Sequence, residues 1–250
     1  MAEVICVVPV APIRAESSHR AEMVSQILFG ETATIIGETK DFYHIQMHQD
    51  DYEGWCQKLQ LQILPEGASI VTNGYAPNWV NPAVFNGQPI QLPLGAPIVS
   101  YAHADFEFTY TAASLDPANN AFTPAALEIV AKQFLGTAYL WGGRTVFGID
   151  CSGFVQMVFK LFNYKLPRDA YQQADMGEAI GFLAEAKPGD LAFFDNEQGK
   201  ITHVGILLSP HQIIHASAVV RIDPIDQAGI VSSTTGLRTH QLRTIRRIAL

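Results

Sequence analysis

Apolar and polar residues alternate in short runs along the first half of the chain. The segment Tyr43–Met47 is the clearest case, because apolar residues at 43, 45 and 47 are separated by His44 and Gln46. A period of two is typical of a strand with one buried face. Similar short runs, separated by turn residues, are Glu3–Val8, Ala33–Ile36 and Gly54–Gln57. We therefore expect residues 1–64 to form short strands of a small barrel.

Prolines and glycines recur at close intervals over residues 65–100, which argues against helix and favours short strands joined by turns. The polar segment Ser114–Asn120 is rich in turn residues and predicts a linker. The predicted organisation is an all-β region over 1–112, a linker over 113–122 and a further domain over 123–250. Residues 65–112 form either an extension of the first barrel or a second, divergent unit, and the sequence leaves both open.

The second half of the chain changes to helical spacing. Thr123 and Pro124 suit the N-cap and the first helical position, and Gly136 suits the end of that helix. A second helix is expected over Cys151–Phe162. Strand-like runs follow, rich in β-branched and aromatic residues: Leu191–Phe194, His203–Leu208, Gln212–Ser217 and Thr244–Leu250. Helices followed by consecutive strands predict an α+β fold, with helices packed on an antiparallel sheet.

Composition and charge narrow the function. The formal net charge of −8, without a basic cluster, argues against nucleic-acid binding. No stretch approaches 18 apolar residues, so no membrane span is expected. The three cysteines form no CxxC pair, and the first residues lack a signal-peptide pattern, so we expect a reduced, cytoplasmic compartment. His211 and His215 lack the glutamate of a zinc-helix motif, so neither metal nor cofactor is expected. Oligomeric state is not indicated.

Cys151 is the first candidate for chemistry. It follows Gly148-Ile149-Asp150 and lies in the first turn of the predicted helix. Unpaired backbone N–H groups and the helix dipole at that end lower the pKa of a thiol and favour the nucleophilic thiolate. The same N–H groups can stabilise the oxyanion of a tetrahedral intermediate. A buried structural cysteine is the alternative, and Cys151 alone does not separate the two.

Two histidines supply the rest of a catalytic set. His203 opens one predicted strand, and His215 lies on the next, across a turn at Ser209–His211. In an antiparallel hairpin the two would be near cross-strand neighbours. One imidazole could then hold the other in the tautomer that a general base needs. The pattern predicts a nucleophile, a base and a residue that orients the base.

Six segments give the second half a family resemblance. They are Tyr139–Gly143, Gly148–Gly153, Leu166–Asp169, Lys187–Leu191, Thr202–Ile206 and Ile214–Ser217. In their order and spacing, residues 123–250 resemble the NlpC/P60 family of bacterial cell-wall cysteine peptidases. The resemblance implies a papain-like α+β domain with Cys151 as nucleophile, His203 as base and His215 as third polar residue. It also implies a role on the oxyanion or substrate side for Tyr139, Trp141, Asp150, Ser152, Arg168 and Asp169. The implied substrates are murein peptides, cut between γ-D-glutamate and meso-diaminopimelate or L-lysine.

Residues 1–64 resemble a bacterial SH3 domain through Pro12–Glu16, Gly30-Glu31 and Gly54-Trp55. The segments Asp50–Trp55 and Pro167–Gln173 resemble a subgroup in which this domain narrows the cleft. The resemblance then implies a free N-terminal L-Ala before γ-D-Glu, as in the recycling of released peptides.

An ammonium group requires a nearby carboxylate, which Asp150, Asp51 or Glu16 could supply, and Tyr52 could add a hydrogen bond. An exposed turn is the alternative for Asp51 and Tyr52, and Asp150 is equally suited to capping the helix. Two competing functions use the same fold: a murein-peptide binding module, or an amidase or acyltransferase. The intact set of Cys151, His203 and His215 favours the peptidase.

Overall fold

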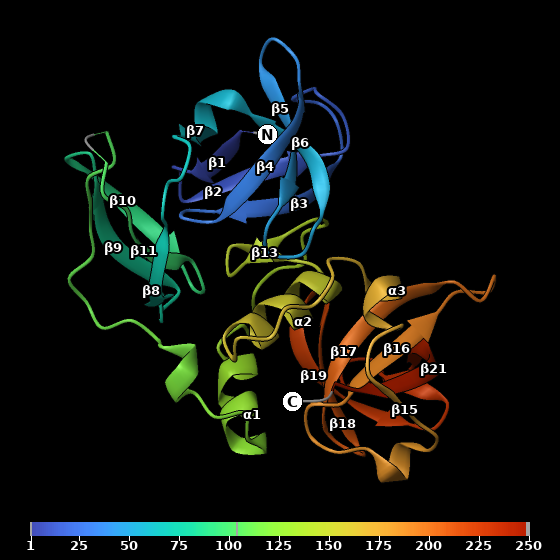
Figure 1. Ribbon diagram of the computed structural model, residues 1–250. Coiled ribbons are helices and arrows are strands. Elements are labelled where there is room, and N and C mark those ends of the chain that lie inside the picture. Colours follow the sequence, from blue (N-terminus) through green and yellow to red (C-terminus); the bar gives the residue numbers. More distant parts are fainter. Residues whose placement is uncertain (1, 104, 249–250) are drawn as a thin grey trace. The chain divides into compact units, whose positions relative to one another are not determined.

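The computed structural model describes residues 2–103 and 105–248, and Figure 1 draws its strands and helices. Its internal contacts divide the chain into two compact units. The first contains Met1–Asn120 together with Trp141–Val146, and the second contains Ala121–Leu140 together with Phe147–Leu250. The chain therefore leaves the second unit after Leu140 and returns to it at Phe147. As a result, β13 (Arg144–Thr145) belongs to the first unit and β14 (Gly148–Ile149) to the second.

The first unit begins with a seven-stranded antiparallel sheet in the order β3-β2-β6-β5-β4-β1-β7. Its strands are β1 (Glu3–Cys6), β2 (Val10–Arg14), β3 (Met23–Leu28), β4 (Thr32–Glu38), β5 (Phe42–Met47), β6 (Glu53–Gln57) and β7 (Leu61–Leu64). In β5, Ile45 and Met47 are buried whereas His44 and Gln46 are partly exposed. The alternation seen in the sequence thus places one face of the strand in the core, and the SH3-like β region is confirmed.

Two smaller sheets complete this unit. One pairs β8 (Val71–Tyr75) with β11 (Pro97–Ser100), and the other has β9 (Val80–Phe85) between β10 (Gln88–Pro93) and β12 (Phe108–Thr109). Phe29, which follows β3, packs against them, with its ring centroid 5.3 Å from that of Phe85 and 4.8 Å from that of Phe108. The small sheets therefore share an apolar core with the first sheet.

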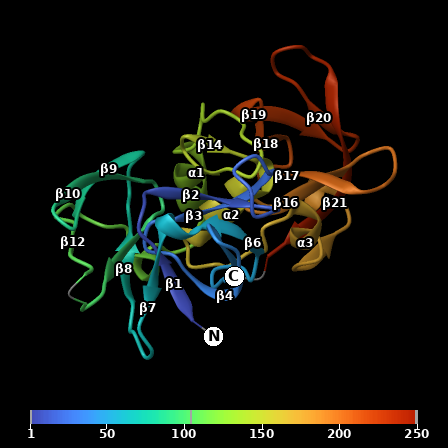
Figure 2. The same ribbon diagram turned by 90° about the horizontal axis from the view of Figure 1, so that it is seen from above.

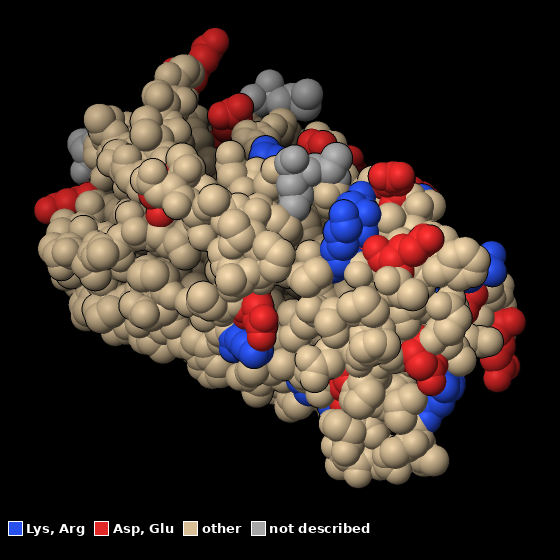
Figure 3. All heavy atoms as spheres, turned by 90° about the horizontal axis from the view of Figure 1, so that it is seen from below, with Lys and Arg blue, Asp and Glu red and all other residues tan. Residues whose placement is uncertain are grey.

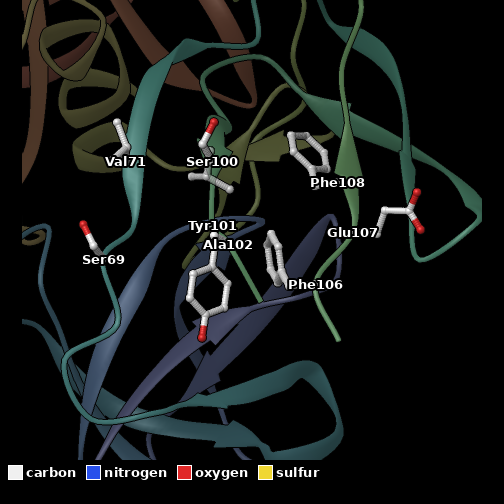
Figure 4. A pocket seen from close by; sticks show the side chains of 9 residues that line it. Ser69, Val71, Ser100, Tyr101, Ala102, Phe106, Glu107 and Phe108 are labelled. Carbon is white, nitrogen blue, oxygen red and sulfur yellow. The ribbon is translucent and has the colours of Figure 1, made fainter. Parts of the chain in front are cut away.

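A hollow of about 520 Å³ opens on these small sheets. Figure 4 shows the side chains that line it. Its lining residues are Ser69, Val71, Val99, Ser100, Tyr101, Ala102, Phe106, Glu107 and Phe108. The rings of Tyr101 and Phe106 meet edge to face, with centroids 5.3 Å apart. All of the lining residues belong to the first unit, whereas Cys151 belongs to the second.

The second unit is built on another seven-stranded antiparallel sheet, in the order β15-β21-β16-β17-β18-β19-β20. Its strands are β15 (Glu178–Ile180), β16 (Leu191–Asp195), β17 (Ile201–Ser209), β18 (Gln212–Ser217), β19 (Val219–Asp226), β20 (Gly229–Val231) and β21 (Arg238–Arg247). Because β20 also pairs with β21, the strands from β16 to β21 close into a ring. The strand predicted over Thr244–Leu250 is the end of β21, and residues 249–250 lie outside the described residues.

The α-helices of this unit are α1 (Pro124–Lys132), α2 (Cys151–Lys160) and α3 (Ala170–Gln173). Short 3-10 turns also occur along the chain: η1 (Lys58–Gln60), η2 (Pro117–Asn119) and η3 (Leu183–Glu185). As predicted, Thr123 caps α1, since its hydroxyl accepts a hydrogen bond from the N–H of Ala126 at 3.2 Å. Helix α2 lies against β17 and β18 (Figure 1 and Figure 2). In the described part of the chain, no helix is both long and apolar enough to cross a membrane.

The prediction of an α+β fold with helices packed on a sheet was wrong, because the chain is mostly β. The described residues contain strands β1 to β21 but α-helices of only nine, ten and four residues. Glycines and prolines interrupt the segments between the helices and hold them in loops. The long strands β19 and β21 also include residues that show no clear alternation of apolar and polar positions in the sequence. The antiparallel order of the sheet is as expected.

Aspartates pair with the arginines near the C-terminus. Arg238 lies 2.7 Å from Asp226, and Arg247 lies 2.7 Å from Asp190. Arg243 is 3.6 Å from Asp195. Figure 3 shows a face on which Lys and Arg lie singly among Asp and Glu. Each of these three arginines thus has a carboxylate close by.

Candidate active site

Cys151 is the first residue of α2, and Asp150 is the N-cap. The Asp150 carboxylate accepts a hydrogen bond from the N–H of Gly153 at 2.7 Å, so the helix begins where the sequence predicts. The Cys151 thiol is buried and donates to the carbonyl of Thr202 at 4.0 Å. Because Thr202 immediately precedes His203, the nucleophile candidate lies against the start of β17.

Burial and the neighbouring Asp150 charge raise the pKa of the Cys151 thiol to about 12. Hydrogen bonds involving the backbone of Val204 and Ser152 act in the opposite direction but do not outweigh burial. The prediction that the helix N-terminus favours the thiolate was therefore wrong for the protein without substrate. Cys151 holds its proton, and a base must remove that proton as the sulfur reacts.

His203 and His215 lie on the adjacent antiparallel strands β17 and β18, as predicted. Nε2 of His203 is 2.8 Å from Nδ1 of His215. Gly205 lies directly opposite His215 in this pairing, which places the two histidines diagonally across the strands. A side chain at 205 would crowd His215, because a Cβ there would lie 2.8 Å from the His215 Cβ. The glycine therefore leaves the space that the histidine pair occupies.

Asp223 was missed in the sequence, although it extends this pair. Nε2 of His215 is 3.0 Å from Oδ2 of Asp223, which lies on β19. Although burial alone would raise it, hydrogen bonds from Ser233, His215 and Arg221 lower the pKa of Asp223 to about 2. A carboxylate, a histidine and a second histidine thus form one hydrogen-bonded series. The signal that could have revealed Asp223 is the tight hairpin after Ser217, which brings β19 back along β18.

His240 on β21 was also missed, and its ring stacks on that of His203. The two ring centroids are 4.1 Å apart at an interplanar angle of 25°. Burial, together with the charges of His215 and His240, holds the pKa of His203 well below its usual range. Burial likewise lowers the pKa of His215, against the opposing effect of Asp223. Both His203 and His215 are therefore neutral near pH 7.

These three imidazoles are the cluster of described residues that could offer nitrogen ligands to a metal. The ligand atoms of His203, His215 and His240 lie within 4.8 Å of one another. Two of those rings are hydrogen-bonded to each other, and such a bond places a proton between their nitrogens. The third ring is stacked on the first. The arrangement fits proton transfer better than metal binding.

Tyr139 lies beside the loop that leads to Cys151. The N–H of Leu140 donates to the carbonyl of Ile149 at 3.1 Å, and the N–H of Ile149 donates to the carbonyl of Ala138 at 3.1 Å. Burial, followed by the charges of Cys151 and Asp150, raises the pKa of the Tyr139 phenol. Its hydroxyl is therefore protonated and can donate a hydrogen bond.

Arg168 and Asp169 make contacts at the starts of helices α2 and α3. Nη1 of Arg168 lies 3.0 Å from Oδ1 of Asp150 and 2.9 Å from the hydroxyl of Ser152, and all three residues are buried. Asp169 caps α3, in a capping box with Gln172. The helix-capping alternative for Asp150 is thus confirmed. Direct contact of these four predicted site residues with substrate stays a prediction.

Trp141, Asp51 and Tyr52 belong to the first unit, whereas Cys151 belongs to the second. The indole N–H of Trp141 donates to the carboxylate of Glu22 at 2.6 Å. Asp51 is exposed and has a positive φ of 58° in the turn between β5 and β6, and Tyr52 follows it half-buried. Their participation in substrate binding stays a prediction.

The fold and the site define a cysteine peptidase. The profile of the NlpC/P60 family matches residues 136–239, and that of the bacterial dipeptidyl-peptidase Sh3 domain matches residues 13–61. The chain is 31% identical over 216 residues to a gamma-D-glutamyl-L-lysine dipeptidyl-peptidase of Bacillus subtilis, covering 77% of this chain and 71% of that protein. It is 27% identical over 252 residues to a protein of the same name from Bacillus cereus, covering 88% and 75%. The chain belongs to the NlpC/P60 family of peptidases.

Solved structures show the same fold. An NlpC/P60 family protein from Bacillus cereus matches with a TM-score of 0.74 and 17% identity, over 98% of this chain and 99% of that one. An NlpC/P60 endopeptidase from Photobacterium damselae matches with a TM-score of 0.65 and 15% identity, over 97% of this chain and 70% of that one. At these identities the similarity concerns the fold alone.

Proposed function

We propose that the protein is an endopeptidase of murein peptides, which hydrolyses the bond between γ-D-glutamate and L-lysine or meso-diaminopimelate. Cys151 is the nucleophile, His203 the base and His215 the residue that orients the base. The observation that carries this proposal is the 2.8 Å hydrogen bond between the two histidines, one strand residue away from the carbonyl that the thiol contacts.

The chemical step begins with a neutral thiol, because the pKa of Cys151 is raised and that of His203 is lowered. Nδ1 of His203 takes the thiol proton as the sulfur attacks the peptide carbonyl carbon. The first turn of α2 has N–H groups without intrahelical partners, and with the Tyr139 hydroxyl these groups stabilise the oxyanion. The His203 imidazolium then protonates the departing amine, and water hydrolyses the remaining thioester.

The substrate class rests on the relatives. Two proteins that are similar over most of this chain are named gamma-D-glutamyl-L-lysine dipeptidyl-peptidases. A dipeptidyl-peptidase removes two residues from a free amino end, so the substrate here would begin with a free L-Ala before γ-D-Glu. A carboxylate must then meet the ammonium group. Asp150, Asp51 and Glu16 are the predicted carboxylates, and Arg168 already compensates the charge of Asp150.

Mass spectrometry of a digested peptide panel tests this proposal. The panel contains L-Ala-γ-D-Glu-L-Lys, its meso-diaminopimelate counterpart, and N-acetylated forms of both. We expect release of L-Ala-γ-D-Glu from the free peptides, much slower cleavage of the acetylated ones, and no cleavage by Cys151→Ala. Equal rates on free and acetylated peptides would remove the ammonium requirement, and cleavage by Cys151→Ala would remove Cys151 from the mechanism.

The same panel separates the alternatives. A binding module would retain the peptides without cutting them, and an amidase or acyltransferase would leave the γ-D-glutamyl bond intact while acting on another amide or ester. A cytoplasmic role in peptide recycling belongs to this proposal, and fractionation of cells with an antibody to the native protein would test it.

A further inference from the structure

Asp223 begins a hydrogen-bonded series of three side chains that continues through His215 to His203. Its Oδ2 lies 3.0 Å from Nε2 of His215, and Nδ1 of His215 lies 2.8 Å from Nε2 of His203. Both histidines are buried, with 1% and 6% of their surfaces exposed for His215 and His203. Polar atoms that are withdrawn from water must satisfy one another, so the protonation of each ring determines that of the next.

The groups around Asp223 keep its carboxylate ionised, and this determines which nitrogen of His215 carries a proton. Its Oδ1 accepts hydrogen bonds from the N–H of Ser233 at 2.8 Å and from Nη2 of Arg221 at 2.9 Å. Its Oδ2 lies 2.9 Å from Nε of Arg221. Donors thus surround both oxygens, which stabilises the ionised form, and an ionised carboxylate can only accept hydrogen bonds. Nε2 of His215 must therefore carry a proton.

The remaining steps follow from the chemistry of imidazole. A neutral imidazole has one N–H and one bare nitrogen, so Nδ1 of His215 is an acceptor. Nε2 of His203 then donates to it, which leaves Nδ1 of His203 without a proton. That nitrogen is the one able to accept the proton of the Cys151 thiol. The lowered pKa values of both histidines agree with neutral rings.

We propose that Asp223 is a positioning residue of this peptidase, which sets the tautomers of His215 and His203 and thereby keeps Nδ1 of His203 free to act as the base. The inference rests on the proposed roles of Cys151 and His203 but not on the identity of the peptide. Asp223 touches neither the substrate nor the sulfur, and its effect passes entirely through His215.

Asparagine at position 223 has nearly the same shape as aspartate, but its amide can donate hydrogen bonds where the carboxylate only accepts them. Its amide NH₂ would meet two donors, Ser233 and Arg221, if it took the place of Oδ1. In the place of Oδ2 it would meet one donor, Nε of Arg221, and it would face Nε2 of His215, which can become an acceptor by shifting its proton to Nδ1. The second orientation creates fewer donor–donor conflicts. His215 would then donate to His203, and the proton of His203 would move to Nδ1, where it blocks the base.

The test compares Asp223→Asn with Asp226→Asn. Asp226 lies on the same strand, but its carboxylate pairs with Arg238 at 2.7 Å. In protein labelled with ¹⁵N-histidine, the ring nitrogen signals report which nitrogen of His203 carries the proton. We expect Nε2–H in the native protein and in Asp226→Asn, and Nδ1–H in Asp223→Asn. The kcat for L-Ala-γ-D-Glu-L-Lys should fall by about 100-fold or more in Asp223→Asn, with little change in KM, as for a serine protease whose orienting carboxylate is replaced by its amide.

A second comparison separates positioning from a structural effect. The rate at which iodoacetamide alkylates Cys151, followed by peptide mapping, needs no peptide substrate. Asp223→Asn should slow alkylation in the native background and have no further effect in a His215→Ala background. An unchanged His203 tautomer, or equal slowing in both backgrounds, would overturn the proposal. Failure of the native protein to cut the peptide would count against the proposed substrate alone, because the tautomer and the alkylation rate are read without it.

Discussion

Gly205 allows the histidine pair to exist, and replacing it with alanine tests that view. It lies directly opposite His215 in the pairing of β17 with β18. A Cβ at 205 would lie 2.8 Å from the Cβ of His215 and 2.7 Å from Cδ1 of Ile213, whereas ordinary contact begins at 3.4 Å. His215 would therefore have to recede by about 0.6 Å, the difference between 3.4 and 2.8 Å. The hydrogen bond to His203, now 2.8 Å long, would approach or pass the end of the normal range.

Two quantities should change in Gly205→Ala. Overpacking of this kind costs about 1–3 kcal/mol of the free energy of unfolding, measured by urea denaturation. Misplacement of a catalytic group by about 1 Å can cost roughly 100-fold in rate, so we expect a fall in kcat of about 10- to 100-fold on L-Ala-γ-D-Glu-L-Lys. Gly181→Ala is the matched control, because the nearest atom to its Cβ would be Oε2 of Glu185 at 3.9 Å. If Gly205→Ala matched Gly181→Ala in both kcat and stability, the packing argument would be refuted.

Three further predictions concern single groups of the site. Tyr139→Phe removes a protonated hydroxyl beside the nucleophile and should lower kcat by about 100-fold in steady-state assays, and an unchanged kcat would exclude the hydroxyl from oxyanion stabilisation. Arg168→Met leaves the buried Asp150 carboxylate unpaired and should cost about 3–5 kcal/mol in urea denaturation, whereas a loss below about 1 kcal/mol would show that the pair is dispensable. The base works when His203 is neutral, and its pKa is lowered, so kcat/KM should persist below pH 6.5 and decline only in more acidic solution. An acid limb at or above pH 6.5 would contradict a base of lowered pKa.

Local features of the sequence were sufficient to predict the helix that begins at Cys151 and the pairing of His203 with His215. Asp150 marks a helix start because aspartate is a residue type that caps helices, and the structure begins α2 at Cys151. His203 and His215 are separated by one turn, so a hairpin alone brings them together. Both inferences depend on residues that are close in the chain. For such residues, the geometry of a single helix or hairpin determines which side chains come into contact.

The parts that were missed depend on packing between distant segments. His240 reaches His203 only because β16 lies between β21 and β17 and pairs with both strands. The pKa of Cys151 depends on how deeply the whole unit buries its sulfur, and the helix dipole that the sequence reveals is outweighed by that burial. The predicted fold class was wrong for a related reason, because the pairing of distant strands makes the protein mostly β.

The passage of residues 141–146 through the first unit has a consequence for protein engineering. Arg144 in that passage is fully buried, and its guanidinium lies 3.0 Å from the carboxylate of Glu31. These six residues connect Tyr139 to the segment that carries Cys151. Two residues of the site are therefore joined by a segment that belongs to the other unit. If the chain were cut at the linker and the first unit removed, residues 141–146 would be exposed and the buried Arg144 would lose its partner Glu31. The peptidase half is therefore a poor portable module, and a graft onto another protein should carry the SH3-like half with it.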